Sequence, residues 1–396
     1  MNWILSIVGL IVSLLLSLVV LELGTRWWFR HRDRYYVWPP YLRLEFHPDQ
    51  EVFPELEKQV RLEINSDGER GHEPPASLNG LYRILVAGGS PAECALLDLP
   101  TSWPGALERI LTKPEHLRML GASRARVGNI GRSGIASAHL NLIFQKVLPQ
   151  YRHLSAVIVM VGGNDVWDWL QRGAPAVYTP SPVPITEAFS ICPGRLFGRM
   201  LTVPALREFL REIWKRSFHP IKVRQHSGKW VGKARAMRAR AKEIRNSVPD
   251  PKDMLANFEH NFKELLNTAK AHADRVLVAR QPWFEKNHYT PEEVSHFWSG
   301  GMGDPSTGEE VTVFYSLDVC SQLMRLMDLR AAQIADELGV EHLNLVPLLE
   351  PSLKTFYDFI HFTPAGAAVV AEAITKILLQ PHSKKQGACA LPVQSF

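Results

Sequence analysis

Four short polar motifs constrain this chain more than any other feature of the sequence. Three of them end apolar segments: GGS (88–90), NIGRSG (129–134) and GGND (162–165). The fourth, DFIH (358–361), lies near the C-terminus, just ahead of a helical pattern. Because ligands bind at the carboxyl ends of the strands in an open parallel sheet, polar groups from all four motifs are expected to converge at one edge of a single sheet.

The pattern between the motifs predicts the fold class. Five short apolar runs, bounded by Gly, Pro or Asn, are predicted to be strands: 82–88, 126–130, 155–161, 275–280 and 341–345. Helical patterns alternate with them at 102–111, 136–148, 254–271, 317–338 and 364–379. Thr363 and Pro364 form a good N-cap and first position for the last helix. This alternation predicts an α/β fold, a three-layer α/β/α sandwich with a parallel five-stranded sheet.

The residue types in these motifs suit acyl transfer. A serine hydroxyl such as that of Ser90 becomes a nucleophile only when a base removes its proton. His361 could be that base, and Asp358, three residues earlier, could fix its tautomer and stabilise the imidazolium. Each piece also has an ordinary explanation, because Gly-Gly-Ser turns are common and a surface Asp near a surface His is unremarkable. The segment lacks the GxSxG nucleophile elbow, since Ala occupies position 92.

An oxyanion needs hydrogen-bond donors aimed at it. The side-chain amide of Asn164 and the backbone N–H groups of Ser90 and Gly134 could supply three, with Gly131 as a rival for Gly134. A plain strand-end turn is the alternative for the GGND segment, since Gly and Asn often fill turns.

Taken together, the four motifs resemble the SGNH hydrolases, also called the GDSL family, over roughly residues 82–379. GGSPAE departs from the Gly-Asp-Ser-Leu block by a Gly before the serine, which is a known variant, and GGND and DFIH match the blocks that carry the Asn and the Asp-x-x-His. The segment NSDGERG (65–71) is similar to a turn upstream of the first block in bacterial members. The resemblance implies a flavodoxin-like sheet, a triad of Ser90, His361 and Asp358, an oxyanion hole of Ser90, Gly134 and Asn164, and no cofactor or metal.

Other residues near the motifs are open to two interpretations. Arg280 ends the fourth predicted strand and could bind an anionic substrate group, or form an ordinary ion pair. Glu93 could be a second acid, although a solvated or structural side chain is the more usual role of Glu. Asp165 and Asp168 could tune the site or be solvated at a helix start. Several tryptophans could line an acyl or sugar pocket or pack in the core: Trp167, Trp169, Trp283 and Trp298.

The N-terminal segment from Trp3 to Leu21 carries no charge and is long enough to cross a bilayer as a helix. A retained anchor is favoured over a cleaved signal, because no basic n-region or A-x-A-like cleavage site is present and Trp27 and Trp28 follow at once. Four arginines follow the span: Arg26, Arg30, Arg32 and Arg34. By the positive-inside rule they place the large domain in the cytoplasm, and an exported domain is the alternative.

These observations predict an anchor at 1–24, a juxtamembrane segment at 25–80, a hydrolase domain at 81–380 and a disordered tail at 381–396. A basic helical insertion at 166–253 interrupts the domain. The insertion could be a solvated cap, lie against anionic lipid headgroups or attract an anionic glycan. A net charge of only +5 and the absence of a recognised motif argue against nucleic acid. The four cysteines show no CxxC pair or zinc spacing.

The sequence therefore predicts a membrane-anchored serine esterase that hydrolyses an acetyl or acyl ester of a carbohydrate or lipid. Two alternatives use the same residues or the same fold. An O-acyltransferase would pass the acyl group to a glycan hydroxyl instead of water, and a non-catalytic glycan-assembly protein would retain the fold without turnover. The motifs leave the acyl chain and the alcohol undefined, because specificity resides in the insertion and the loops.

Overall fold

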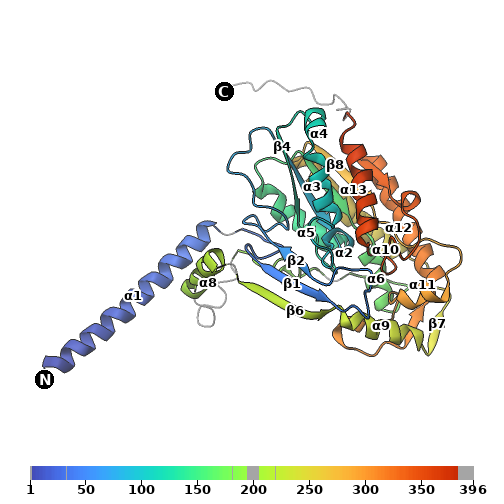
Figure 1. The fold of residues 1–396 in the computed structure, drawn as a ribbon. Helices are drawn as coiled ribbons and strands as arrows, with labels where there is room; N and C mark the ends of the chain where they lie inside the picture. Colours follow the sequence, from blue (N-terminus) through green and yellow to red (C-terminus); the bar gives the residue numbers. More distant parts are fainter. Residues whose placement is uncertain (1, 33, 181, 194–204, 219, 382–396) are drawn as a thin grey trace, which may run out of the picture.

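The structure, a computed structural model, describes residues 2–32, 34–180, 182–193, 205–218 and 220–381. A sheet lies at the centre of the domain (Figure 1). It has five strands in the order β10-β8-β5-β3-β4, and every pair of neighbours is parallel. The strands are β3 (Leu81–Gly88), β4 (Arg124–Asn129), β5 (Ala156–Met160), β8 (Arg275–Arg280) and β10 (Glu341–Asn344). All five predicted strands are confirmed to within one or two residues at each end.

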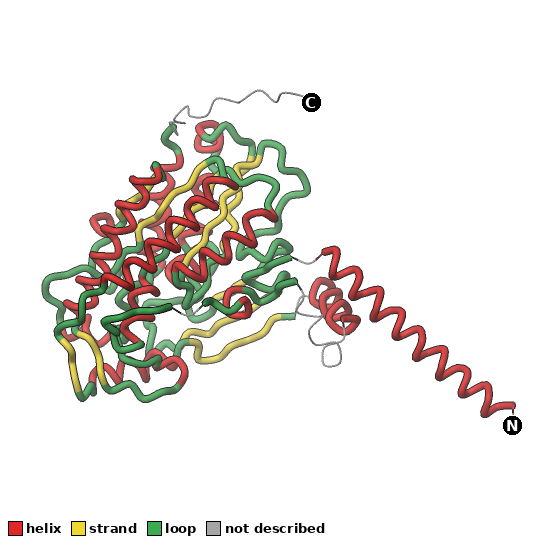
Figure 2. Tube along the Cα trace, turned by 180° about the vertical axis from the view of Figure 1, so that it is seen from behind, coloured by secondary structure: helices red, strands yellow, loops and turns green. Residues whose placement is uncertain are grey.

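Helices cover both faces of this sheet. On one face, α3 (Trp103–Leu111) packs against α13 (Pro364–Leu378). On the other face, α10 (Lys252–His272) packs against both α5 (Ser137–Val147) and α12 (Leu317–Leu338), as right-handed crossovers require (Figure 2). The predicted three-layer α/β/α architecture is therefore confirmed.

The sequence explains the central strand and the last helix directly. Every residue of β5 is buried, because the run AVIVM is apolar on both faces and helices cover each side. The side chain of Thr363 accepts a hydrogen bond from the Gly366 N–H, and Pro364 occupies the first turn of α13, as the sequence predicts. This cap sets the start of α13 just after the DFIH motif.

A second sheet was not expected from the sequence. Its order is β2-β1-β6, in which β1 (Arg43–Pro48) pairs with β2 (Val60–Glu63) antiparallel and with β6 (Ile221–Ser227) parallel. The prediction of a basic helical insertion is therefore wrong at β6 and at β7 (Glu243–Arg245), which pairs with β9 (Val313–Tyr315). It is correct at α8 (Ala205–Phe218) and α9 (Lys229–Ala239).

The N-terminal helix α1 (Asn2–Arg32) projects away from the domain as a single long rod (Figures 1 and 2). Its segment Trp3–Trp28 is long and apolar enough to cross a membrane, which makes it a candidate anchor; a signal sequence can have the same character. The predicted tail lies outside the described residues from position 382 onward. The remaining helices are α2 (Ser90–Glu93), α4 (Pro114–Met119), α6 (Gly163–Gln171), α7 (Ile185–Ala188) and α11 (Pro291–His296), with 3-10 turns at Leu148–Gln150, Pro305–Thr307 and Val346–Leu348.

Candidate active site

Ser90 lies at the carboxyl end of β3, where the chain turns into the one-turn helix α2. Two glycines make this turn possible. A Cβ on Gly88 would lie 2.0 Å from the carbonyl oxygen of Met160 in β5, and one on Gly89 would lie 2.6 Å from the side-chain nitrogen of Asn164. The Gly-Gly pair therefore lets the strand end approach both β5 and Asn164, and it places the serine hydroxyl beside them.

The structure brings Ser90, His361 and Asp358 into one hydrogen-bonded row. The Nε2 atom of His361 lies 2.7 Å from the Ser90 Oγ, and its Nδ1 lies 2.7 Å from Asp358 Oδ2. When Nδ1 carries the proton and donates it to the carboxylate, Nε2 can accept from the serine hydroxyl. This is the geometry that general-base activation of a serine requires.

Asp358 is held from several sides. Its Oδ1 accepts hydrogen bonds from the backbone N–H groups of Ile360 and His361, at 3.0 and 2.9 Å. Burial raises the pKa of Asp358, but the nearby His361 and these hydrogen bonds outweigh it and lower the pKa to about 2. The carboxylate therefore stays ionised and keeps facing the imidazole.

Trp298 donates its indole N–H to Asp358 Oδ2 at 3.0 Å. The sequence suggested Trp298 only as a pocket or core residue, and this contact was not foreseen. A second ring supports the histidine, because Tyr357 stacks on His361 with ring centroids 5.4 Å apart and planes 6° apart. Backbone groups thus orient one oxygen of Asp358, and Trp298 orients the other.

The candidate oxyanion donors Gly134 and Asn164 line one cavity with Ser90. The Asn164 amide donates one hydrogen to the Ile135 carbonyl at 2.8 Å, which fixes the amide and leaves its second hydrogen available. Gly134 has φ +78°, and both residues line the same cavity as Ser90. The rival Gly131 is already engaged, since its N–H donates to the Asn129 side chain at 2.8 Å. The geometry therefore favours Gly134 over Gly131.

Glu93 is buried, so of the two ordinary roles expected for it, solvated or structural, the structure shows the structural one. The Oε2 atom of Glu93 accepts from both the backbone N–H and the hydroxyl of Ser133, each at 2.5 Å. Burial raises the pKa of Glu93, and the Ser133 hydrogen bonds offset this only in part. Glu93 thereby ties the end of α2 to the loop that carries Gly134.

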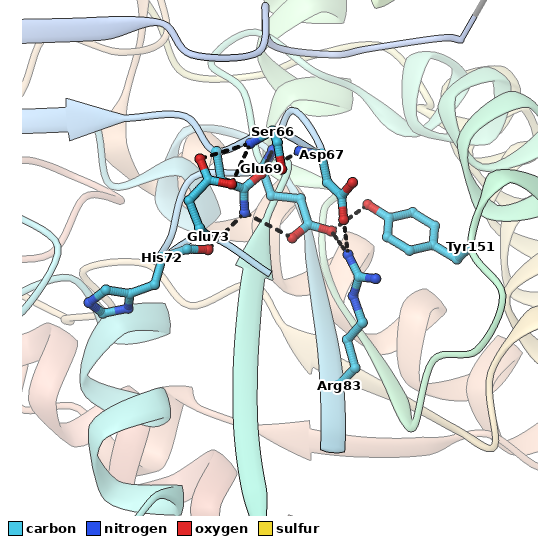
Figure 3. A network of polar contacts seen from close by, with 8 residues as sticks. Ser66, Asp67, Glu69, His72, Glu73, Arg83 and Tyr151 are labelled. Atoms are coloured by element: carbon cyan, nitrogen blue, oxygen red, sulfur yellow. Dashed lines mark hydrogen bonds and ion pairs between the residues drawn. The ribbon is translucent and has the colours of Figure 1, made fainter. Parts of the chain in front are cut away.

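The NSDGERG turn (65–71) makes hydrogen bonds to the segment that follows Ser90. Arg70 is buried, and its guanidinium donates to the carbonyls of Glu93, Cys94 and Leu97, at the end of α2 and just after it. The turn itself is anchored to the main sheet (Figure 3): Arg83 in β3 donates to Glu69 at 2.9 Å and to Asp67 at 2.7 Å. Tyr151 donates to Glu69 at 2.6 Å. This motif therefore positions the turn that carries Ser90.

Ser90 and His361 open onto a cavity of about 360 Å³. Its walls combine Gly134 and Asn164 with a loop at 299–306 and three indoles, those of Trp167, Trp230 and Trp298. Trp230 comes from α9 in the insertion and packs edge-on against Trp298 at 4.9 Å. Trp169 and Trp283, which the sequence also offered as pocket residues, are buried in the core instead.

Arg280 does not line this cavity. Its guanidinium pairs with the Asp328 carboxylate through two hydrogen bonds, one of 2.7 Å, and both side chains are partly buried. The structure therefore shows the ordinary ion pair and not the substrate contact. Asp165 is also buried and accepts from the Ser137 N–H and hydroxyl at the start of α5. Asp168, in contrast, lines the cavity and pairs with Arg172 at 2.9 Å.

Comparison with known proteins gives two kinds of finding. No family model and no curated protein sequence matches the chain. Among solved structures, the chain is similar to the acetylxylan esterase Axe2 from Geobacillus stearothermophilus, with a TM-score of 0.39 and 15% identity over 75% of this chain and 94% of that one. It is also similar to LAE5, an alpha/beta hydrolase from the metagenome of Lake Arreo in Spain, with a TM-score of 0.37 and 14% identity over 76% and 97% of the two chains.

Proposed function

We propose that this protein is a serine esterase of the SGNH, or GDSL, type, and that α1 anchors its domain of residues 81–380 to a membrane. The observation that carries the proposal is the row of 2.7 Å contacts from Ser90 Oγ to His361 Nε2 and from His361 Nδ1 to Asp358, at the edge of a cavity. The position of the row at the carboxyl ends of parallel strands supports the same assignment.

In the first half-reaction, His361 Nε2 takes the Ser90 proton while Oγ attacks the ester carbonyl carbon. The tetrahedral intermediate collapses when the carbon–alkoxy bond breaks, and the imidazolium gives its proton to the leaving alcohol. In the second half-reaction, His361 takes a proton from water, the hydroxide attacks the acyl-serine, and the proton returns to Ser90 as the acid leaves. Asp358 remains ionised throughout and stabilises the imidazolium that forms in each half-reaction.

The negative charge on the carbonyl oxygen needs donors that are already in place. We assign this role to the backbone N–H groups of Ser90 and Gly134 and to the free amide hydrogen of Asn164. The Ser90 N–H lies in the first turn of α2, where no intrahelical acceptor is available. Asn164 is held in its orientation by Ile135, so its amide need not reorganise when charge develops.

The cavity suggests a carbohydrate ester as the substrate class, with a lipid ester as the alternative. Three indole side chains face a space that also carries the Asp168 carboxylate and the backbone of the 299–306 loop. Flat aromatic faces beside polar groups suit the apolar faces and hydroxyls of a sugar ring. The same acyl-serine could pass its acyl group to a glycan hydroxyl, which would make the protein an O-acyltransferase.

The test is labelling of the full-length protein with a fluorophosphonate probe, together with hydrolysis of 4-nitrophenyl acetate. Wild type should label and turn over the ester, and Ser90→Ala should do neither. Ser306→Ala is a matched control, because Ser306 lines the same cavity without contacting His361, and it should behave like wild type. A folded wild-type protein that neither labels nor hydrolyses would support the non-catalytic alternative. Acyl product on an added acetyl-acceptor oligosaccharide, in place of free acid, would identify a transferase.

A further inference from the structure

Helix α8 is attached to α1 at the point where α1 leaves its candidate membrane span. The backbone N–H groups of Ala205 and Leu206 both donate to the carboxylate of Glu22 at 2.8 Å, so a residue of α1 caps α8. Phe209 packs edge-on against Trp28 at 5.2 Å. The span runs from Trp3 to Trp28, so both contacts fall near its domain-proximal end, where α8 lies beside α1 (Figures 1 and 2).

One face of α8 is apolar and uncovered. Its large apolar side chains follow the i, i+3, i+4, i+8 spacing of a helical stripe and are all strongly exposed: Leu210 56%, Ile213 46%, Trp214 50% and Phe218 72%. Trp214 and Phe218 lie next to each other, with ring centroids 6.3 Å apart. Further along the chain, Ile221 and Val223 at the start of β6 are also exposed, at 46% and 52%. An exposed apolar helix face of this kind marks a contact surface.

Basic residues surround the stripe. Arg207, Arg211 and Arg216 lie on the exposed surface of α8, and Lys222 and Arg224 alternate with the apolar residues of β6. The acidic residues of α8 are Glu208, which pairs with Arg211, and Glu212. An amphipathic helix with aromatic and aliphatic residues on one face and basic residues around it is typical of the interface of an anionic bilayer.

We propose that α8 and the start of β6 dock in the headgroup region of the membrane that α1 crosses, with Trp214 and Phe218 inserted and the basic residues against anionic headgroups. Lipid therefore covers the exposed apolar side chains of α8. The stripe lies on a helix that contacts the candidate span, because Glu22 caps α8 and Phe209 packs on Trp28. The proposal rests on the membrane anchoring by α1 proposed above, and not on the reaction that the cavity performs.

Docking of α8 gives the domain a second attachment to the bilayer. A single helix would let the domain rotate about its linker, whereas α8 ties α1 to the domain through β6, which pairs with β1. The chain then continues from β6 through Gly228 into α9, whose Trp230 forms a wall of the cavity. The interfacial helix and the cavity wall thus belong to one segment, and docking sets the direction in which the cavity faces.

The experiment is nitroxide accessibility on the full-length protein in nanodiscs, one copy per disc, in a Cys192→Ser, Cys389→Ser background. Cys94 and Cys320 are buried and can stay. Labels at Trp214→Cys and Phe218→Cys test the stripe. A label at Val177→Cys, an apolar position 77% exposed on a domain loop, is the matched control, and a label at Leu15→Cys reports whether α1 is inserted. Collision with oxygen, which partitions into lipid, is compared with collision with a water-soluble nickel chelate.

In discs that contain phosphatidylglycerol, we expect the ratio of oxygen to nickel collision at positions 214 and 218 to exceed that at 177 at least fivefold. The ratio should fall in pure phosphatidylcholine. Ratios at 214 and 218 equal to that at 177, while the label at 15 is deep, would overturn the proposal. A second result would also overturn the proposal. Labels at 214 would show dipolar coupling in discs loaded with two copies and would stay accessible to nickel in single-copy discs, because a second copy of the chain and not lipid would then cover the stripe.

Discussion

Replacement of Trp298 by Phe removes one hydrogen bond from the catalytic row and little else. Phe keeps an aromatic ring against Trp230 and in the cavity wall, but it lacks the N–H that donates to Asp358 Oδ2 at 3.0 Å. The backbone donors to Asp358 Oδ1 and the contact from His361 Nδ1 remain. Trp298 is therefore a positioning residue, whose effect on Ser90 passes through Asp358 and His361.

The expected loss follows from the chemistry of this bond. A hydrogen bond to a charged group contributes about 1.5–3 kcal/mol, and the lower end applies because Trp298 is only partly buried and Asp358 keeps its other donors. A loss of about 1.4 kcal/mol corresponds to a roughly tenfold decrease in rate. We expect this decrease in kcat for 4-nitrophenyl acetate with little change in KM, because the bond acts on the catalytic groups and not on the ester.

The assay is steady-state kinetics of Trp298→Phe, beside Trp230→Phe as the matched control. Trp230 also lines the cavity and packs against Trp298, but no hydrogen bond joins it to Asp358. In Trp298→Phe alone, kcat should fall about tenfold while KM stays close to that of wild type. Equal kcat and KM values for the two variants would refute the positioning role of Trp298.

Three further predictions follow from the site. Asn164→Ala should lower kcat by about 10²–10³-fold with little change in KM, as loss of one oxyanion donor does, and steady-state kinetics would contradict this if KM alone rose. Burial raises the pKa of Asp165 from 3.8 to about 6, so the folded state binds this proton more tightly than the unfolded state does. The free energy of unfolding should therefore fall by about 3 kcal/mol as the pH rises from about 4 to 6. Urea denaturation should show this slope in wild type and a flatter one in Asp165→Asn. Arg70→Met removes the guanidinium from three buried carbonyls, of which only that of Cys94 keeps another donor, the Leu97 N–H, and it should lower the free energy of unfolding by about 3 kcal/mol; an unchanged urea midpoint would contradict it.

The sequence predicts the main sheet well because its strands are buried on both faces. The runs at 82–88 and 155–161 contain unbroken apolar segments, ILVA at 84–87 and AVIVMV at 156–161, and such segments depend little on distant partners. The same reason makes the site accessible to prediction, since a motif that follows a buried strand must lie at the sheet edge. His361 and Ser90, which meet at 2.7 Å, are placed by local signals alone: a strand end and a helix cap.

The second sheet could not be predicted in this way. The sequence of β6, IKVRQHS, alternates apolar and basic residues, and its side chains are mostly exposed on both faces. It becomes a strand only by pairing with β1, from a distant part of the chain, so no local pattern identifies it. Trp298 is a similar case, because it lies 60 residues before Asp358 on a loop, and only the assembled fold brings its indole to the carboxylate.

This difference separates the parts of the protein that are proposed to perform the reaction from the parts that would choose its substrate. The groups proposed for catalysis come from strand ends and a helix start, which a parallel sheet brings together with almost any sequence in the loops. The walls of the cavity come instead from α9 and the 299–306 loop, which long-range contacts hold in place: Arg235 of α9 donates to the carbonyls of Val52 and Tyr357, and Arg238 donates to that of Ser299. The same insertion carries α8. Substrate choice and the proposed membrane contact are therefore coupled through one segment, and changes in that segment should alter which ester is used before they alter how it is cleaved.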